Sequence, residues 1–346
     1  MARKALYVGI ESYQSYGNLP GCCKDAQELA ALLQTHDNGG PNFTAKVLAK
    51  SQVTTAELSG AIHELFQPFD GDILFYFSGH GDQDSTSHYL ITSNAAPGAL
   101  GFRMNDLLTL AEGALKHCQS VTIILDCCHA GAVGNNNVHS LVPTTQLAEG
   151  ITLLAAASTD QAAVMINNRS AFTQLLMRAL NGGAADPRGR VTTAAVYAFI
   201  ESSFGPFHQR PIYKTHEFRS TALRYAEPSV QDSELRRLTE LFATPDAVVQ
   251  LSADFENFIL QPDKVPKYDC SDTIVDAIGN PEKLNKRKLL KNFQLAGLAR
   301  LQVVDKTRAP PDGKLTDLFW ACLYGQGVRL TVAGRFYWDL VNTHRI

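Results

Sequence analysis

The sequence predicts an α/β protein in which a six-stranded, mainly parallel sheet lies between two layers of helices, followed by a small, mainly helical C-terminal domain. Apolar runs without alternation are typical of strands buried on both faces. Here they alternate with helical segments of roughly ten residues or more, which are the crossovers that parallel neighbours need. The charge balance shifts after Glu227-Pro228, from an acidic stretch at 229–282 to a basic one at 283–308. We therefore place one domain at 1–228 and a second at 229–346.

The first domain contains all six predicted strands. They are the apolar, β-rich runs at 5–10, 43–48, 72–77, 121–125, 151–157 and 221–225. Between them, apolar residues recur with helical spacing. The helices that this spacing predicts are 25–34, 54–66, 104–117, 171–180 and 192–204. Thr54 followed by Glu57 is typical of a capping box at a helix start.

Composition excludes several classes of protein. The chain has 346 residues, of which 45% are hydrophobic and 19% charged, with a formal net charge of −3, so it is neither disordered nor of low complexity. No stretch approaches the length of a membrane span, and the N-terminus runs directly into a strand, so we expect a cytoplasmic protein without a membrane partner. Seven cysteines without metal-ligand spacing indicate reduced thiols, and catalysis by one of them has to be considered.

Two short motifs follow neighbouring strands. Ser78-Gly79-His80-Gly81 ends the third predicted strand, on a turn whose unusual torsions Gly79 would permit, and Asp126-Cys127-Cys128-His129 ends the fourth. The carboxyl ends of adjacent parallel strands meet at one edge of a sheet, where active sites collect. A free thiol has a pKa of about 8.5, so a nearby imidazole is what makes it a useful nucleophile at neutral pH. The pair predicts a cysteine–histidine hydrolase.

The motifs S-G-H-G and D-C-C-H-A-G, in this order and spacing, resemble those of the caspase-haemoglobinase clan, and within it the metacaspases and orthocaspases, over roughly residues 4–227. The resemblance implies a three-layer α/β/α sandwich with Cys128 as nucleophile and His80 as its dyad partner. It also implies an oxyanion hole formed by the backbone N–H groups of Gly81 and Cys128. Cys127 would point to the opposite face of its strand, and we interpret His129 as a structural residue that orients the loop.

A third motif, Leu19-Pro20-Gly21-Cys22-Cys23-Lys24-Asp25-Ala26, is similar to the metacaspase segment G-C-x-x-D-A. The resemblance implies an S1 pocket, which receives the substrate residue before the scissile bond (P1), formed by Cys22, Asp25, Ser78 and Asp126. Taken alone, Asp25 is better explained as an acid that the helix dipole favours. Together with Asp126 it makes a doubly acidic pocket, which requires a cation, so we expect Arg or Lys at P1.

The sequence departs from the calcium-dependent members of the family. They carry an acidic cluster after S-G-H-G and a further acid after the nucleophile. Here only Asp82 and Asp84 follow the first motif closely, and the stretch 131–147 has no acid. A hard cation needs six or more oxygen ligands with several carboxylates, so we expect no metal and no cofactor. Calcium-independent orthocaspases are the closer match.

The C-terminal domain combines a basic helix at 286–295 with a short ribbon and a helix at 332–341, which is similar to a winged-helix module. Such a module could bind phosphates, but residues 229–346 hold 16 basic and 15 acidic side chains, which disfavours a nucleic-acid partner. By analogy with the effector-associated domains of prokaryotic caspase-like proteins, we expect an adaptor that recruits a protein partner.

The sequence therefore predicts a cytoplasmic cysteine endopeptidase that cleaves after Arg or Lys in a regulated proteolytic response, such as prokaryotic defence or programmed cell death. The alternative is a non-proteolytic regulator that uses the caspase fold as a scaffold and acts through the C-terminal domain. We also expect Gln209-Arg210-Pro211 to belong to a substrate-binding loop. The stretch 131–150 contains no Lys or Arg, so an enzyme of this specificity would not cut there itself.

Overall fold

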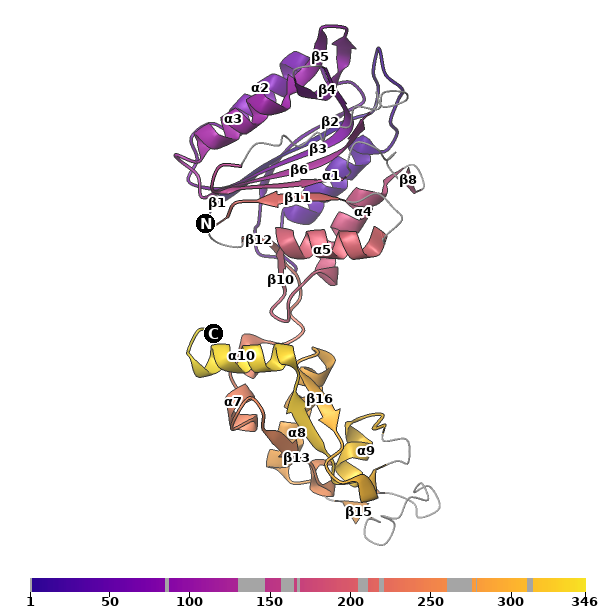
Figure 1. The fold of residues 1–346 in the computed structure, drawn as a ribbon, viewed down its shortest axis with the longest axis vertical. Helices are drawn as coiled ribbons and strands as arrows, with labels where there is room; N and C mark the ends of the chain where they lie inside the picture. The colour runs from indigo at the N-terminus through magenta and orange to yellow at the C-terminus, as the bar shows by residue number, and fades with distance from the viewer. Residues whose placement is uncertain are drawn as a thin grey trace. The chain divides into compact units, whose positions relative to one another are not determined.

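The structure is a computed structural model and shows two compact units, Met1–Glu227 and Pro228–Ile346 (Figure 1). It describes residues 2–84, 87–129, 147–156, 165–166, 169–204, 211–217, 221–259, 276–277, 279–309 and 314–346. The expected loop residues Gln209 and Arg210, and nearly all of 131–150, lie outside the described residues. In the described part of the chain, no helix is both long and apolar enough to cross a membrane.

The first unit is built on an eight-stranded sheet with the main order β11-β7-β6-β3-β1-β2. The strands on this path are β1 (Ala2–Ile10), β2 (Thr44–Lys50), β3 (Gly71–Gln83), β6 (Ser120–His129), β7 (Ile151–Ala155) and β11 (Ile212–Thr215). The first five are parallel to one another, and β11 pairs with β7 in the antiparallel direction. The predicted mainly parallel sheet is confirmed.

Helices cover both faces of this sheet (Figure 1). α2 (Thr55–Leu65) and α3 (Met104–Ala114) pack on one face, and α1 (Cys22–Leu33), α4 (Ala171–Arg178) and α5 (Thr193–Phe204) on the other. The side chains of β3 alternate between the two cores, with Phe75 and Phe77 in one and Leu74 and Tyr76 in the other. The capping box predicted for Thr54 and Glu57 is present. All five predicted helices of this unit are confirmed.

The sixth predicted strand is present, but its predicted place in the main sheet is wrong. Residues 221–225 form β12 (Ala222–Tyr225), which pairs with β10 (Arg190–Thr192) in a separate two-stranded sheet, and β11 takes the edge position in the main sheet instead. A hairpin of β4 (His88–Ala96) and β5 (Ala99–Arg103) was not predicted and extends β3. The described residues of the stretch 82–94 are therefore largely strand.

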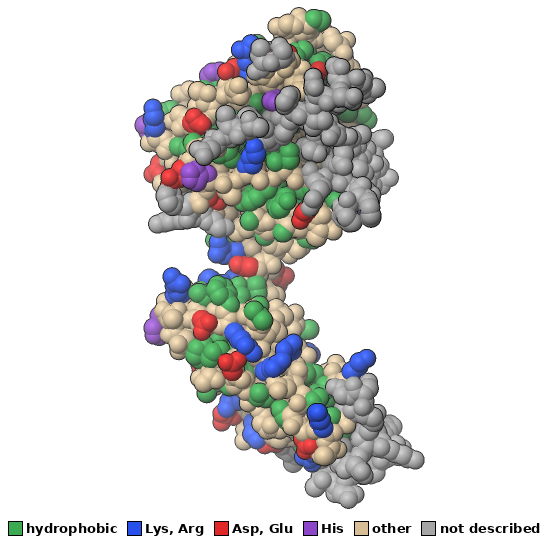
Figure 2. Space-filling view, viewed as in Figure 1, with side chains coloured by type: hydrophobic (Ala, Val, Ile, Leu, Met, Phe, Trp, Pro, Cys, Tyr) green, Lys and Arg blue, Asp and Glu red, His purple; other side chains and the backbone are tan. Residues whose placement is uncertain are grey.

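The second unit has its own apolar core, which is surrounded by helices and by a three-stranded antiparallel sheet with the order β13-β17-β16. Its main elements are α6 (Asp232–Leu235), α7 (Leu238–Leu241), β13 (Val248–Gln250), α8 (Pro281–Leu295), β16 (Ala299–Gln302), α9 (Leu318–Leu323), β17 (Gly327–Leu330) and α10 (Val332–Asn342). Both helices predicted here are confirmed, and α8 begins earlier than expected because Asn280 caps it and Pro281 occupies its first turn. Acidic and basic side chains are interspersed over the face of this unit in Figure 2.

Candidate active site

The two motifs lie side by side on neighbouring strands. In the parallel ladder between β3 and β6, Ser78 is opposite Asp126 and His80 is opposite Cys128. The ladder runs on to Gly81 and His129, so both motifs belong to extended strands. The expectation that they follow strand ends is thereby corrected. The physical reason is that β4 pairs with β3 at Gly81 and continues the backbone hydrogen bonding beyond the body of the sheet. The side chains of Cys128 and His129 lie outside the described part of the structure.

The imidazole of His80 is oriented by a backbone carbonyl. Its Nε2 lies 2.7 Å from the carbonyl oxygen of Gly17. Because a carbonyl only accepts, this contact fixes Nε2 as the protonated nitrogen of the neutral ring and leaves Nδ1 with a lone pair. Burial lowers the pKa of His80, while the contact with Gly17 and the charge of Asp82 act in the opposite direction. The ring is therefore suited to accept a proton at Nδ1 near neutral pH.

Two tyrosines of the loop between β1 and α1 hold this histidine. The ring of Tyr13 lies 4.7 Å from the imidazole and that of Tyr16 lies 5.6 Å away, measured between ring centroids. The hydroxyl of Tyr13 donates to the carbonyl of Ile10 at 3.0 Å and accepts the backbone N–H of His80 at 3.1 Å. Neither tyrosine belongs to a motif that the sequence singles out, although their loop follows a strand at the same edge of the sheet.

The position of the Tyr13 hydroxyl also explains why residue 79 is a glycine. A Cβ atom at this position would lie 2.7 Å from the hydroxyl oxygen of Tyr13, which is closer than real Cβ atoms come. Gly79 is absent from the glycines with positive φ, so the unusual torsions expected here are not found. The glycine is required by the close approach of Tyr13.

The four residues predicted for the S1 pocket are all buried, and Ser78, Asp126 and Asp25 all act on the Cys22 thiol. Cys22 and Asp25 begin α1, and burial raises the pKa of the Cys22 thiol to about 12, while a hydrogen bond with Ser78 partly offsets this. Cys22 is thus a protonated thiol. Burial also raises the pKa of Asp126 to about 6. The carboxylate of Asp25 lies close enough to both groups to act on their pKa values.

Asp25 already has a cationic partner from the same chain, which sequence analysis did not predict. The Nε of Arg169 lies 2.5 Å from Oδ1 of Asp25, and Nη2 of Arg169 lies 2.8 Å from Oε2 of Glu28. The backbone N–H of Ser170 donates to Oδ2 of Asp25 at 3.2 Å. Burial raises the pKa of Asp25, and the contacts with Arg169 and Ser170 lower it in part.

A further missed residue fixes the helix that carries Cys22 and Asp25. The carboxylate of Glu11 accepts the backbone N–H groups of Gly21 at 2.9 Å and Cys23 at 3.2 Å, so an acid caps the N-terminus of α1. Gly21 has a φ of +100°, which a glycine adopts without strain. The start of α1 is therefore held against the sheet by an acid from the loop after β1.

The acids after the first motif have partners of their own. Asp82 accepts the hydroxyl of Tyr16 at 2.7 Å, and Asp84 accepts the hydroxyl of Tyr89 at 2.7 Å. Over the described ranges, no group of three or more His, Cys, Asp or Glu side chains is arranged to hold a metal ion. The absence of a calcium site remains a prediction for the chain as a whole.

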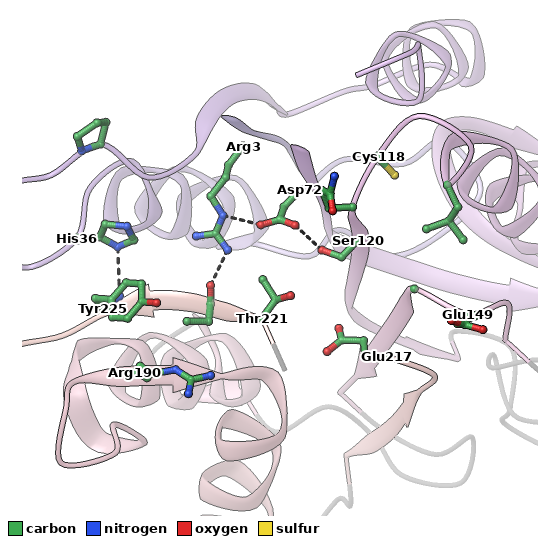
Figure 3. A pocket seen from close by; sticks show the side chains of 15 residues that line it. Arg3, His36, Asp72, Cys118, Ser120, Glu149, Arg190, Glu217, Thr221 and Tyr225 are labelled. Atoms are coloured by element: carbon green, nitrogen blue, oxygen red, sulfur yellow. Dashed lines mark hydrogen bonds and ion pairs between the residues drawn. The ribbon is translucent and has the colours of Figure 1, made fainter. Parts of the chain in front are cut away.

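A cavity of about 800 Å³ lies at the opposite edge of the sheet from His80. Arg3, Asp72 and Ser120, which stand at the amino ends of β1, β3 and β6, contribute to its wall (Figure 3). Asp72 accepts from Arg3 at 3.1 Å and from Ser120 at 2.7 Å. These polar groups satisfy one another and tie three strands together, so we interpret them as structural.

Comparison with known proteins adds independent evidence on the family. The caspase domain family matches residues 2–223. The chain is 29% identical to Metacaspase-5 of Trypanosoma cruzi over 167 residues, which cover 40% of this chain but only 36% of that protein. It is 22% identical to Metacaspase-3 of Trypanosoma brucei brucei over 290 residues, covering 71% and 76% of the two chains. The crystal structure of Caspase-1 from Spodoptera frugiperda aligns with a TM-score of 0.48 and 12% identity, over 65% of this chain and 91% of that one.

The fold and the family match together define a cysteine peptidase with a caspase-like α/β/α sandwich. The chain belongs to the caspase domain family, and the match covers nearly all of the first unit. The second unit lies outside the matched residues.

Proposed function

We propose that the protein is an endopeptidase that cleaves after Arg or Lys, with Cys128 as nucleophile and His80 as its general base. The observation that carries the proposal is the register of β3 and β6, which places the backbones of His80 and Cys128 opposite each other while Gly17 orients the imidazole. Nδ1 of His80 would take the thiol proton, and the thiolate would attack the substrate carbonyl.

The following steps use the same groups. The backbone N–H groups of Gly81 and Cys128 would stabilise the oxyanion, a contribution of about 3 kcal/mol for each donor. The protonated His80 would then donate its proton to the leaving amine, which breaks the peptide bond and leaves a thioester on Cys128. Water, deprotonated by His80, would hydrolyse the thioester and regenerate the thiol.

The preference for a basic P1 side chain is supported by the charges of the pocket. Asp25 is 1% exposed and Asp126 is 5% exposed, so both carboxylates are largely shielded from water. An acidic P1 residue would be repelled, whereas a guanidinium or ammonium group would form charge-assisted hydrogen bonds. We propose a regulated role for this activity, in defence or programmed cell death in the cytoplasm, with the winged-helix-like C-terminal unit as an adaptor for a protein partner.

A panel of fluorogenic peptides that differ only at P1 tests the proposal. Arg and Lys peptides should be cleaved and Asp peptides ignored, and Cys128→Ala and His80→Ala should each abolish turnover while leaving the folded fraction unchanged. Asp25→Ala should raise KM for the Arg peptide at least as clearly as it lowers kcat, because Asp25 would bind the side chain in both the ground state and the transition state. Efficient cleavage after Asp would refute the pocket assignment, and no turnover of any peptide would favour the regulator alternative.

A further inference from the structure

The two carboxylates of the predicted S1 pocket are fully occupied by one short segment of the chain itself. Each of their four oxygens accepts a hydrogen bond from this segment. The donors are Arg169 Nε to Asp25 Oδ1, Ser170 N to Asp25 Oδ2, Ser170 Oγ to Asp126 Oδ1 and Thr173 Oγ1 to Asp126 Oδ2. Of the four donors, only Arg169 carries a charge, and its partner is the acid at the start of α1.

We propose that Arg169 is an internal competitor for the basic P1 side chain, so that it sets how readily the S1 pocket accepts Arg or Lys. The inference rests on the proposed function and adds a specificity-determining residue to it. A P1 guanidinium and the Arg169 guanidinium would both require Oδ1 of Asp25. Two cations cannot share that buried position, because repulsion between them is weakly screened there.

The contacts of Arg169 show how its side chain can move away from Asp25 while the rest of the site stays folded. Its side chain is 14% exposed, and its second partner, Glu28, is 43% exposed. A rotation of the Arg169 side chain toward solvent can therefore release Asp25, and the ion pair with Glu28, which helps to hold the side chain in place, breaks in the same movement. The backbone need not follow, because the hydroxyl of Ser170 caps α4 and is held by Asp126.

This competition should change KM by a measurable factor. The apparent affinity for a ligand falls by the fraction of molecules whose site is free, so a pocket that is open one time in ten raises KM about tenfold. Removing Arg169 should recover that factor in KM. It should leave kcat nearly unchanged, because once the substrate is bound the same pocket contacts are made in both proteins.

The test compares Arg169→Gln with Arg178→Gln in the full chain. Arg178 lies at the other end of α4 and is exposed, so the second variant makes the same charge change away from the pocket. For an Arg-P1 peptide, Arg169→Gln should lower KM by about tenfold with kcat within about twofold, and Arg178→Gln should leave both constants at the wild-type values. Glu28→Gln removes only the outer partner of Arg169 and should lower KM by a smaller factor.

A binding measurement provides a readout independent of turnover. Titration of agmatine, a small guanidinium compound, into Cys128→Ala should show a tighter dissociation constant when Arg169→Gln is added, by the same factor as the change in KM. If Arg169→Gln does not fold, the agmatine titration of Glu28→Gln in the Cys128→Ala background decides the question, with tighter binding expected.

Unchanged or weaker binding and an unchanged or higher KM in the folded variants would overturn the inference and show that Arg169 is purely structural. Failure of the proposed function would look different. In that case wild type, Arg169→Gln and Arg178→Gln would all ignore Arg and Lys peptides, and none would bind agmatine.

Discussion

The hydroxyl of Tyr13 accepts the backbone N–H of His80 at 3.1 Å, and its ring packs on the imidazole of the same residue. One side chain thus fixes both the backbone and the ring of the proposed general base. Gly79 makes this possible, because a side chain there would collide with the Tyr13 hydroxyl. The alignment of the proposed dyad therefore depends on a residue that sequence motifs do not single out.

Tyr13→Phe tests this dependence. The substitution keeps the ring and leaves a partly buried N–H without its acceptor, which costs about 1–3 kcal/mol when such a group is left unsatisfied. We expect kcat to fall more than KM rises, with a lower midpoint of thermal unfolding. Tyr16→Phe is the matched control, since it removes a hydroxyl that contacts Asp82 and not His80. Equal kcat in wild type and Tyr13→Phe would show that the contact has no catalytic consequence.

Gly79→Ala should be more damaging than Tyr13→Phe. The new methyl group would lie 2.7 Å from the Tyr13 hydroxyl oxygen, so the loop or the strand has to shift and the imidazole moves with it. We expect a loss of kcat of at least about tenfold, in line with the sensitivity of catalysis to a misplacement of about 1 Å. Adding Tyr13→Phe relieves the clash and should recover part of the rate, measured as kcat of the double variant against Gly79→Ala alone. A double variant no better than Gly79→Ala would place the damage elsewhere.

Ionisation of Asp126 should give KM a dependence on pH. Burial raises its pKa to about 6, so the carboxyl is neutral at pH 5 and charged at pH 7. We expect KM for an Arg-P1 peptide to fall by up to about tenfold between these values, as the charged fraction rises by that factor. Asp126→Asn should abolish this change in KM. A KM independent of pH in wild type would contradict the role assigned to Asp126.

The same group affects the pH dependence of stability. Its pKa is higher in the folded than in the unfolded state, so between pH 3.8 and about 6 the folded state binds more protons. The contribution of Asp126 to the free energy of unfolding therefore falls as pH rises through this window. Chemical unfolding of wild type and Asp126→Asn at pH 5 and pH 7 measures this contribution. The free energy of unfolding of the variant, relative to that of wild type, should be higher at pH 7 than at pH 5.

Chelation should leave activity within about twofold, since a hard cation needs several charged oxygen ligands to bind usefully. The two acids closest to the first motif, Asp82 and Asp84, already accept tyrosine hydroxyls. Initial rates with EDTA and with added calcium, on the same Arg peptide, check this expectation. A rate that depends strongly on calcium would show that these acids exchange their tyrosine partners for a metal.

Local patterns predicted most of the sheet and its helices, because continuous apolar runs and helical spacing are properties of short stretches of chain. The spacing of the two motifs likewise predicted that His80 and Cys128 would be neighbours. The contact of Arg169 with Asp25 spans 144 positions and has no local pattern. β11 was missed for a related reason, since its four residues include Lys214 and form no continuous apolar run. Sequence patterns therefore predicted the position of the proposed site. They did not predict that Arg169 contacts Asp25 within it.

Maturation provides the last prediction. Residues 131–150, which follow the proposed nucleophile, contain no Lys or Arg, so an enzyme specific for basic P1 residues would not cut there itself. Self-cleavage remains possible at Arg169, or at Arg188 and Arg190 beside glycine-containing turns. The bond after Arg169 is poorly suited, since Ser170 caps α4 and both its N–H and its hydroxyl are engaged with pocket acids. We expect activity as a single chain or activation by a different protease, with self-cleavage still possible after Arg188 or Arg190. Intact-mass spectrometry of wild type against Cys128→Ala measures this. A cut between 131 and 150 that occurs only in wild type would contradict both the maturation prediction and the specificity on which it depends.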